Sequence, residues 1–137
     1  MKSNYKILII DDNIIDQIIT KQLLKKTLGI SEICTVNNGK QGIEWLNNYK
    51  RNPEESLIIL LDIKMPEMDG FEFLSEYEIL PEELKKEIQI FMLSSTLDPN
   101  DITRAKSNKY VKHLLSKPLP VKEFSEMIYP DSSSKTA

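Results

Sequence analysis

The sequence is poor in residues that bind metals through sulfur or nitrogen. Cys34 is the only cysteine and His113 the only histidine among the 137 residues. An internal disulfide, a zinc site built from several cysteines or histidines, and a four-cysteine iron–sulfur cluster are therefore excluded. Any bound metal should have oxygen ligands, which favours a hard ion such as Mg²⁺. A single cysteine also favours a reducing compartment, and we expect a cytoplasmic protein.

Long apolar runs and an excess of positive charge are also missing. No apolar run approaches the roughly 18 residues that span a bilayer, and the short run near the N-terminus ends in two acids, unlike a signal peptide. The 18 basic and 21 acidic residues give a net charge of −3, so nothing points to nucleic acid or a membrane as a partner. The composition is typical of one globular domain. We expect this domain over residues 1–129, and a short flexible tail over residues 130–137.

Short apolar segments alternate with amphipathic ones along the chain. This alternation predicts an α/β fold, with a parallel sheet covered by helices on both faces. The expected strands are residues 6–10, 33–36, 57–61, 88–93 and 113–115. The expected helices are residues 13–29, 71–80, 98–107 and 121–128, with a further helix marked by Ile43 and Leu46 that ends at about residue 49. Residues 81–87 form a charged connector that could also be helical.

The first expected helix has clear end signals and a clear pattern. Asn13 is an N-cap candidate with Asp16 three places later, and Gly29 ends the helix. The apolar residues between them have the spacing of one apolar helical face: Ile14, Ile15, Ile18, Ile19, Leu23 and Leu24.

The expected strands end on polar, chemically useful groups. The third strand is an unbroken apolar run, which suits a strand buried on both faces, yet it runs directly into Asp62. Asp11 and Asp12 follow the first strand, Ser94 follows the fourth and Lys117 follows the fifth. The carboxyl ends of parallel strands lie along one edge of a sheet. If the strand order is 2-1-3-4-5, the three aspartates converge there.

Three converging carboxylates need either a proton or a cation. One like-charge pair at about 4 Å costs roughly 4 kcal/mol at an effective dielectric near 20. Oxygen ligands favour Mg²⁺, and an ammonium (Lys117) and a hydroxyl (Ser94) would face the cluster. These groups suit phosphoryl transfer, with Asp62 as the nucleophile because it ends the central strand, and Asp11 and Asp12 holding the metal.

Four stretches of the sequence resemble the motifs of a known family. They are Lys6–Asp12 (KILIIDD), Leu61–Gly70 (LDIKMPEMDG), Ser94, and Lys117 with Pro118. Together they are similar to the receiver (CheY-like) domains of two-component response regulators, over about residues 4–129. The resemblance implies a flavodoxin-like (βα)5 fold with strand order 2-1-3-4-5. It also implies a phosphoaspartate at Asp62, formed with phosphate from a histidine kinase or a histidine phosphotransfer protein.

The resemblance also assigns the metal ligands. It implies that Asp12, Asp62 and the backbone carbonyl of Lys64 ligate Mg²⁺, and that Asp11 helps through a water molecule.

A competing hypothesis is a phosphatase of the haloacid-dehalogenase type. In that family a second aspartate, two places after the nucleophile, acts as the general acid. Lys64 occupies that position here.

The family's switching residues are only partly matched. The resemblance implies that Lys117 pairs with the phosphoryl oxygens and that its bond to Pro118 is cis. It implies that Ser94, where threonine is commoner, moves its hydroxyl onto the phosphoryl group and switches the surface of the fourth helix, fifth strand and fifth helix. The usual aromatic residue three places before the lysine is replaced by Leu114, and Tyr110 is out of register.

These residues favour a stand-alone phosphoacceptor switch over an enzyme. Only nine residues follow Ile128, too few for a DNA-binding or catalytic module. The expected output is therefore contact with a downstream protein or onward phosphoryl transfer. We expect a monomer or weak homodimer, and a composition rich in Ile, Lys and Asn indicates a bacterial source. The alternative is a receiver-fold binding module that works without phosphorylation.

Overall fold

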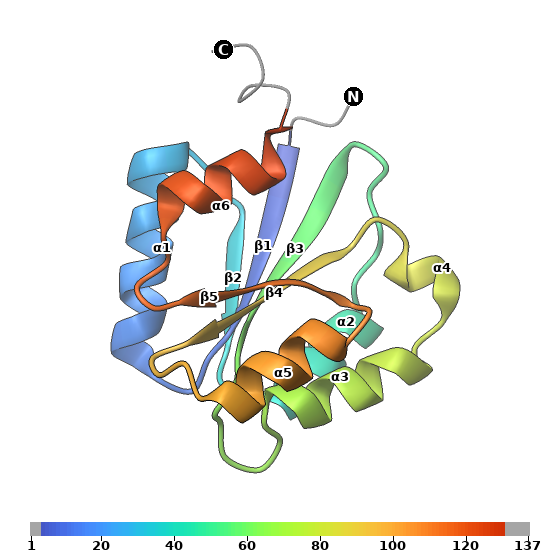
Figure 1. The fold of residues 1–137 in the computed structure, drawn as a ribbon. Helices are drawn as coiled ribbons and strands as arrows, with labels where there is room; N and C mark the ends of the chain where they lie inside the picture. The colour runs from blue at the N-terminus through green and yellow to red at the C-terminus, as the bar shows by residue number, and fades with distance from the viewer. Residues whose placement is uncertain (1–3, 131–137) are drawn as a thin grey trace.

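Within residues 4–130, five parallel strands form one sheet in the order β2-β1-β3-β4-β5, as the sequence predicts (Figure 1). The computed structural model describes residues 4–130. Residues 131–137 of the expected tail lie outside this range. The strands are β1 (Asn4–Ile10), β2 (Ile33–Val36), β3 (Glu55–Asp62), β4 (Gln89–Ser94) and β5 (Val111–Ser116).

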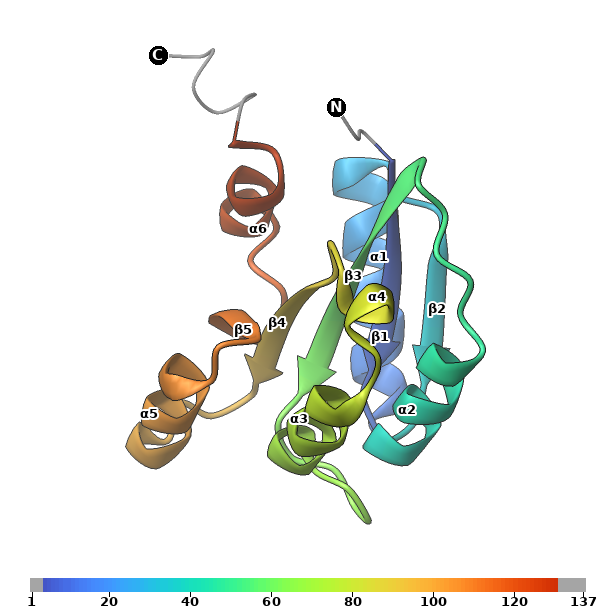
Figure 2. The same cartoon turned by 90° about the vertical axis from the view of Figure 1, so that its right-hand side faces the viewer.

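Helices cover both faces of the sheet. In Figures 1 and 2, α1 (Ile14–Leu28) and α6 (Val121–Ile128) lie on one face, and α2 (Gly39–Asn47), α3 (Gly70–Ile79) and α5 (Pro99–Ser107) lie on the other. The charged connector contains one further short helix, α4 (Glu82–Lys85). The described residues thus form a flavodoxin-like α/β fold, with this one short helix added to the five expected.

The unbroken apolar run of β3 is explained by packing on both faces. Leu57, Ile59 and Leu61 belong to the core beneath α2, α3 and α5, whereas Ile58 and Leu60 belong to the core beneath α1 and α6. Successive side chains of a strand point to opposite faces, so a central strand covered on both sides needs an apolar residue at every position. All five side chains are at most 2% exposed.

The first helix does not pack as its apolar pattern predicts. The four isoleucines of its first turns, Ile14, Ile15, Ile18 and Ile19, are between 43% and 63% exposed. The side chains that α1 buries are Gln17, Thr20 and Leu24. Polar residues can take buried positions when their hydrogen bonds are satisfied, and the amide of Gln17 donates to the carbonyl oxygen of Asp11 (2.5 Å). The predicted apolar face is therefore wrong for its first half, which lies on the surface.

None of the helices formed by residues 4–130 is both long enough and apolar enough to cross a membrane.

The Asn13 side chain caps α1 by accepting from the amide of Asp16 (3.0 Å). Gly29 ends the helix in the left-handed conformation (φ 68°), which glycine adopts without steric cost. Both end signals in the sequence are thus confirmed.

Candidate functional site

The three aspartates meet at the carboxyl edge of the sheet, toward which the arrowheads of β2, β3 and β4 point in Figure 2. Because β1 and β3 are neighbours, Asp11 and Asp12 lie beside Asp62, and one carboxylate oxygen of each lies within 4.8 Å of the others. Asp11 and Asp62 are buried, and Asp12 is exposed. The predicted convergence is confirmed, and the donor set is all oxygen and open to solvent on one side. Such a set fits Mg²⁺.

Lys117 reaches this cluster from the end of β5. Its backbone amide donates to the carbonyl oxygen of Ser94 (2.9 Å), which ties the end of β5 to the end of β4. The Lys117–Pro118 bond is cis, as expected. The ammonium Nζ lies 2.9 Å from Asp11 Oδ2 and 3.3 Å from Asp62 Oδ1. One cation, whose side chain is 11% exposed, therefore compensates two of the three clustered carboxylates.

The electrostatics of the cluster favour a proton or a cation. Burial, followed by the negative charge of Asp11, raises the pKa of Asp62 from 3.8 to about 7, although Lys117 acts in the opposite direction. Burial alone would lower the pKa of the Lys117 ammonium. Its hydrogen bonds to Asp16 and Asp11 and the charge of Asp62 outweigh burial and raise this pKa above the usual range. Lys117 therefore stays charged, and the ionised form of Asp62 is disfavoured unless a further cation lies beside it.

The turn after β3 is fixed by its own sequence. Asp69 caps α3 by accepting from the amide of Glu72 (2.8 Å), and the Glu72 carboxylate accepts from the amide of Asp69 in return (2.9 Å). The amide of Gly70 donates to the carbonyl of Ile63 (2.8 Å). A Cβ on Gly70 would lie 2.7 Å from the backbone oxygen of Asp62, so only glycine allows this close return of the chain.

Lys64 and Ser94 lie near the site, but their functional groups are engaged elsewhere. The Lys64 side chain is exposed, and its Nζ lies 3.9 Å from Asp101 Oδ2. The role of its backbone carbonyl stays a prediction. The Ser94 hydroxyl donates to the carbonyl of Thr96 and accepts from the amide of the same residue (3.2 Å). Ser94 therefore faces its own loop in this state of the molecule.

Leu114 takes the position of the family's aromatic residue, and the nearby Tyr110 packs elsewhere. Leu114 is half-buried and, with residues of α5, lines a hollow of about 390 Å³. Tyr110 packs edge-on against Tyr77, with ring centroids 5.1 Å apart, and its hydroxyl accepts from the ammonium of Lys85 (3.2 Å). Tyr110 therefore belongs to the packing around Lys85 and does not replace the missing aromatic ring.

Sequence reasoning missed two residues that shape the site. Asp16 Oδ2 lies 2.8 Å from Lys117 Nζ, the shortest of the three contacts of that ammonium with carboxylates. Gln17 donates from Nε2 to the backbone oxygen of Asp11 and to the side chain of Asn37 (3.0 Å). The available signal was the position of these two residues in the sequence. They lie in the first turn of the helix that follows Asp11 and Asp12, and that turn must lie at the same edge of the sheet. The sequence pattern alone marks Asp16 only as a residue three places after the N-cap.

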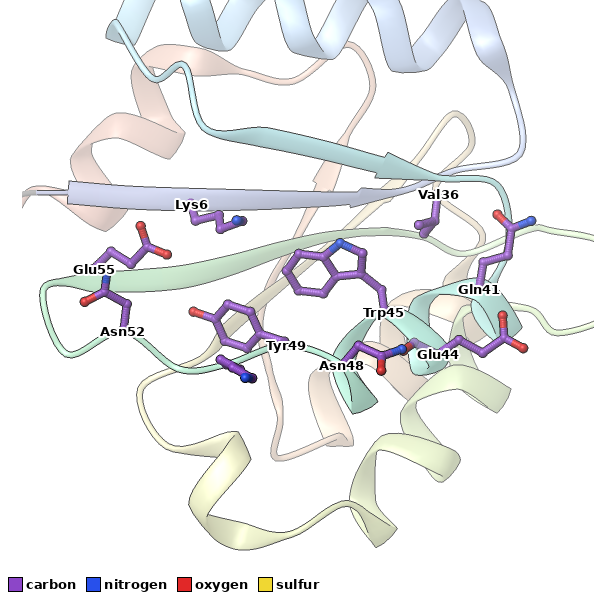
Figure 3. Close-up of a pocket in the computed structure, with 10 residues that line it drawn as sticks. Lys6, Val36, Gln41, Glu44, Trp45, Asn48, Tyr49, Asn52 and Glu55 are labelled. Atoms are coloured by element: carbon purple, nitrogen blue, oxygen red, sulfur yellow. The ribbon is translucent and has the colours of Figure 1, made fainter.

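A separate hollow of about 620 Å³ lies between α2 and strands β1 and β2 (Figure 3). Figure 3 shows the side chains of Trp45 and Tyr49 beneath these strands, with Lys6 projecting from β1. The two rings are stacked at 5.1 Å, and the Lys6 ammonium lies 5.7 Å from the centre of the Trp45 ring. None of the residues predicted to act in phosphoryl transfer lines this hollow, so it is not part of the candidate site.

Known proteins share both the fold and the sequence pattern. A sequence model of the response regulator receiver domain matches residues 7–129. The solved structure of a response regulator receiver protein from Dyadobacter fermentans is 33% identical, with a TM-score of 0.84, and the alignment covers 92% of this chain and 96% of that one. The sensor histidine kinase CheAY of Helicobacter pylori is 43% identical over 74 residues, which are 54% of this chain and 9% of that protein. The rice two-component response regulator ORR1 is 27% identical over 125 residues, 89% of this chain and 53% of that protein.

The fold and the acidic edge define a receiver-type α/β domain. The match over residues 7–129 goes further: the chain belongs to the response regulator receiver domain family. Receiver domains are phosphoacceptor switches that generally bind Mg²⁺ at an acidic pocket and interact with histidine kinases or phosphotransfer proteins. The chain spans about a tenth of the kinase and about half of the rice protein. The rice relative also shows that similar proteins are not confined to bacteria, so the bacterial source stays a prediction.

Proposed function

We propose that this protein is a single-domain response regulator that accepts a phosphoryl group on Asp62, with Mg²⁺, from a histidine kinase or a phosphotransfer protein. The observation that carries the proposal is the cluster of Asp11, Asp12 and Asp62 with the Lys117 ammonium against two of its members. We further propose that residues 1–129 form the domain and residues 130–137 a short tail.

The proposed reaction is a transfer between two side chains. A carboxylate oxygen of Asp62 attacks the phosphorus of a phosphohistidine, the P–N bond breaks and a P–O bond forms, and the histidine nitrogen leaves with the electron pair. Asp62 must be ionised to attack, and the neighbouring Lys117 favours that form. Mg²⁺, held by Asp12, Asp62 and the carbonyl of Lys64, with Asp11 acting through water, would neutralise the oxygens of the transferring group. Lys117 supplies the second positive charge at those oxygens.

The proposed switch starts from the Ser94 hydroxyl. Ser94 now bonds to Thr96, and a phosphoryl oxygen offers this hydroxyl a charged acceptor, which makes a stronger hydrogen bond than a carbonyl does. Rotation of Ser94 toward the phosphoryl group would move the β4–α5 loop and change the surface of α5, β5 and α6. Output is then contact with a downstream protein or onward phosphorelay. No nucleic acid or membrane is expected as a partner. The protein is proposed to act in the cytoplasm as a monomer or weak homodimer.

The first test is mass spectrometry of the intact protein. Acetyl phosphate with Mg²⁺ should add one phosphoryl group, and the addition should be lost in Asp62→Asn and when the metal is chelated. A protein that stays unlabelled, and whose spectrum does not respond to beryllofluoride, would instead be the phosphorylation-independent binding module.

The exposed isoleucines of α1 offer a docking face for the phosphoryl donor. Ile14, Ile15, Ile18 and Ile19 form an apolar patch directly after the acidic pair, and contiguous exposed apolar side chains mark interaction surfaces. Replacement of Ile18 by lysine should slow transfer from a phosphorylated donor protein at least tenfold and leave labelling by acetyl phosphate unchanged. Ile79→Lys is the matched control, because Ile79 is an equally apolar, exposed side chain on α3. Equal transfer rates in the two variants would disprove the assignment of this face.

A further inference from the structure

The Lys117 ammonium is shared among three carboxylates, and one of them is not part of the aspartate cluster. Nζ lies 2.8 Å from Asp16, 2.9 Å from Asp11 and 3.3 Å from Asp62. An ammonium has three N–H donors, so each can point to one of these oxygens. Asp16 makes the shortest of these three contacts, and Asp62, the proposed phosphoacceptor, makes the longest.

Asp16 is held in this position by the helix that carries it. Its backbone amide is satisfied by the side chain of Asn13, so the cap of α1 does not depend on the Asp16 carboxylate. That carboxylate accepts a hydrogen bond from Lys117 and is 31% exposed, whereas Asp11 is 2% exposed. It therefore lies at the rim of the site, fixed by the first turn of α1, and its contact with Lys117 is separate from the proposed metal ligands.

This arrangement opposes the phosphorylated state in two ways. Phosphoryl oxygens on Asp62 need donors from Lys117, and the Asp16 carboxylate competes for one of them, at 2.8 Å from Nζ against 3.3 Å for Asp62. The Asp16 carboxylate is also a fixed negative charge close to a group that carries further negative charge, and such like-charge contacts are unfavourable. Both effects destabilise the phosphorylated state.

We propose, on the basis of the function proposed above, that Asp16 is a positioning residue. It keeps the Lys117 ammonium away from the phosphoryl group and thereby weakens the binding of that group in the site. The consequence is easier loss of that group to an acceptor. A histidine nitrogen of a phosphotransfer protein attacks the phosphorus, the P–O bond breaks, and the Asp62 carboxylate and its bond to Lys117 are restored. Asp16 thus favours passage of the phosphoryl group over its storage.

The test is the affinity of the full chain for beryllofluoride, a tetrahedral mimic of the phosphoryl group, titrated by calorimetry at saturating Mg²⁺. Removal of the charge in Asp16→Asn should lower the Kd roughly three- to tenfold. Asp16→Glu keeps the charge and should stay near the wild-type Kd. Glu44→Gln, which removes an exposed carboxylate of α2, controls for the loss of surface charge and should also leave the Kd unchanged. Asp16→Ser replaces the asparagine variant if that variant does not fold.

A second readout reports on Lys117 directly. The side-chain ammonium signal of Lys117 in a ¹H–¹⁵N spectrum should shift in Asp16→Asn before any beryllofluoride is added, which a merely structural role of Asp16 would not produce. If the wild-type protein binds beryllofluoride and Asp16→Asn binds it with an equal or higher Kd, this inference alone is overturned. Failure of the wild-type protein to bind beryllofluoride would overturn both this inference and the proposed function.

Discussion

Replacement of Asp62 by asparagine should stabilise the protein at neutral and alkaline pH in the absence of metal. The substitution removes a buried charge whose pKa is raised from 3.8 to about 7, first by burial and then by Asp11. One pKa step corresponds to about 1.4 kcal/mol, so the ionised carboxylate costs at most about 4 kcal/mol of unfolding free energy. The asparagine amide keeps a polar group in the same place, and we therefore expect a gain of about 2–4 kcal/mol.

The pH dependence of this effect has a definite sign. Below about pH 4, Asp62 is protonated in both the folded and the unfolded protein, and its ionisation has no effect on stability. Between about pH 4 and pH 7 the unfolded chain has lost the proton and the folded protein still binds it, so the wild-type protein loses stability as the pH rises. Above about pH 7 the full cost is present. The gain from Asp62→Asn should therefore grow from pH 4 to pH 7 and then stay constant.

The assay is urea unfolding followed by Trp45 fluorescence at several pH values, with chelator and with Mg²⁺. Mg²⁺ should stabilise the wild-type protein at pH 8 and have little effect on Asp62→Asn, because a ligand stabilises only the state that binds it. Glu44→Gln should show no such pH-dependent gain. A variant Asp62→Asn that is no more stable than the wild type at pH 8, or that shows the same gain at pH 4, would refute the argument from buried charge.

Two further substitutions test how the site is supported. Gly70→Ala should destabilise the protein by about 1–3 kcal/mol and slow phosphoryl labelling, because its Cβ would lie 2.7 Å from the Asp62 backbone oxygen and 2.8 Å from the Met92 methyl group; wild-type values in urea unfolding and in labelling would contradict this. Gln17→Ala should cost about 1–3 kcal/mol, because it leaves the carbonyl of Asp11 without this buried partner. An unchanged urea midpoint for Gln17→Ala would show that water replaces the amide.

The elements of the fold were largely predictable from local signals. The apolar run that ends at Asp62 identified the central strand, because a strand covered on both faces needs apolar residues at every position. Asn13 and Gly29 marked the ends of α1 through backbone hydrogen bonds that their own neighbours complete. The cluster of aspartates followed once the strand order was assumed, since neighbouring parallel strands bring their carboxyl ends together.

The errors and omissions have a common cause. The isoleucines of α1 had the spacing of a buried face, but the rotation of the helix on the sheet is set by Gln17 and Leu24, and the isoleucines are left exposed. The contact between Asp16 and Lys117 joins residues 101 positions apart. No local pattern contains it, because it depends on how α1 is seated relative to the end of β5.

The sequence by itself thus determined which segments form strands and most of the helices, where most of them end, and that polar groups follow four of the strands. These properties depend on backbone geometry and on apolar periodicity, which act over a few residues. Only the tertiary structure decided which face of α1 is buried, which carboxylate holds Lys117 most closely, and where the Ser94 hydroxyl points. Those outcomes depend on the packing of whole elements and on the competition among buried charges, whose energies are set by distances between residues far apart in the chain.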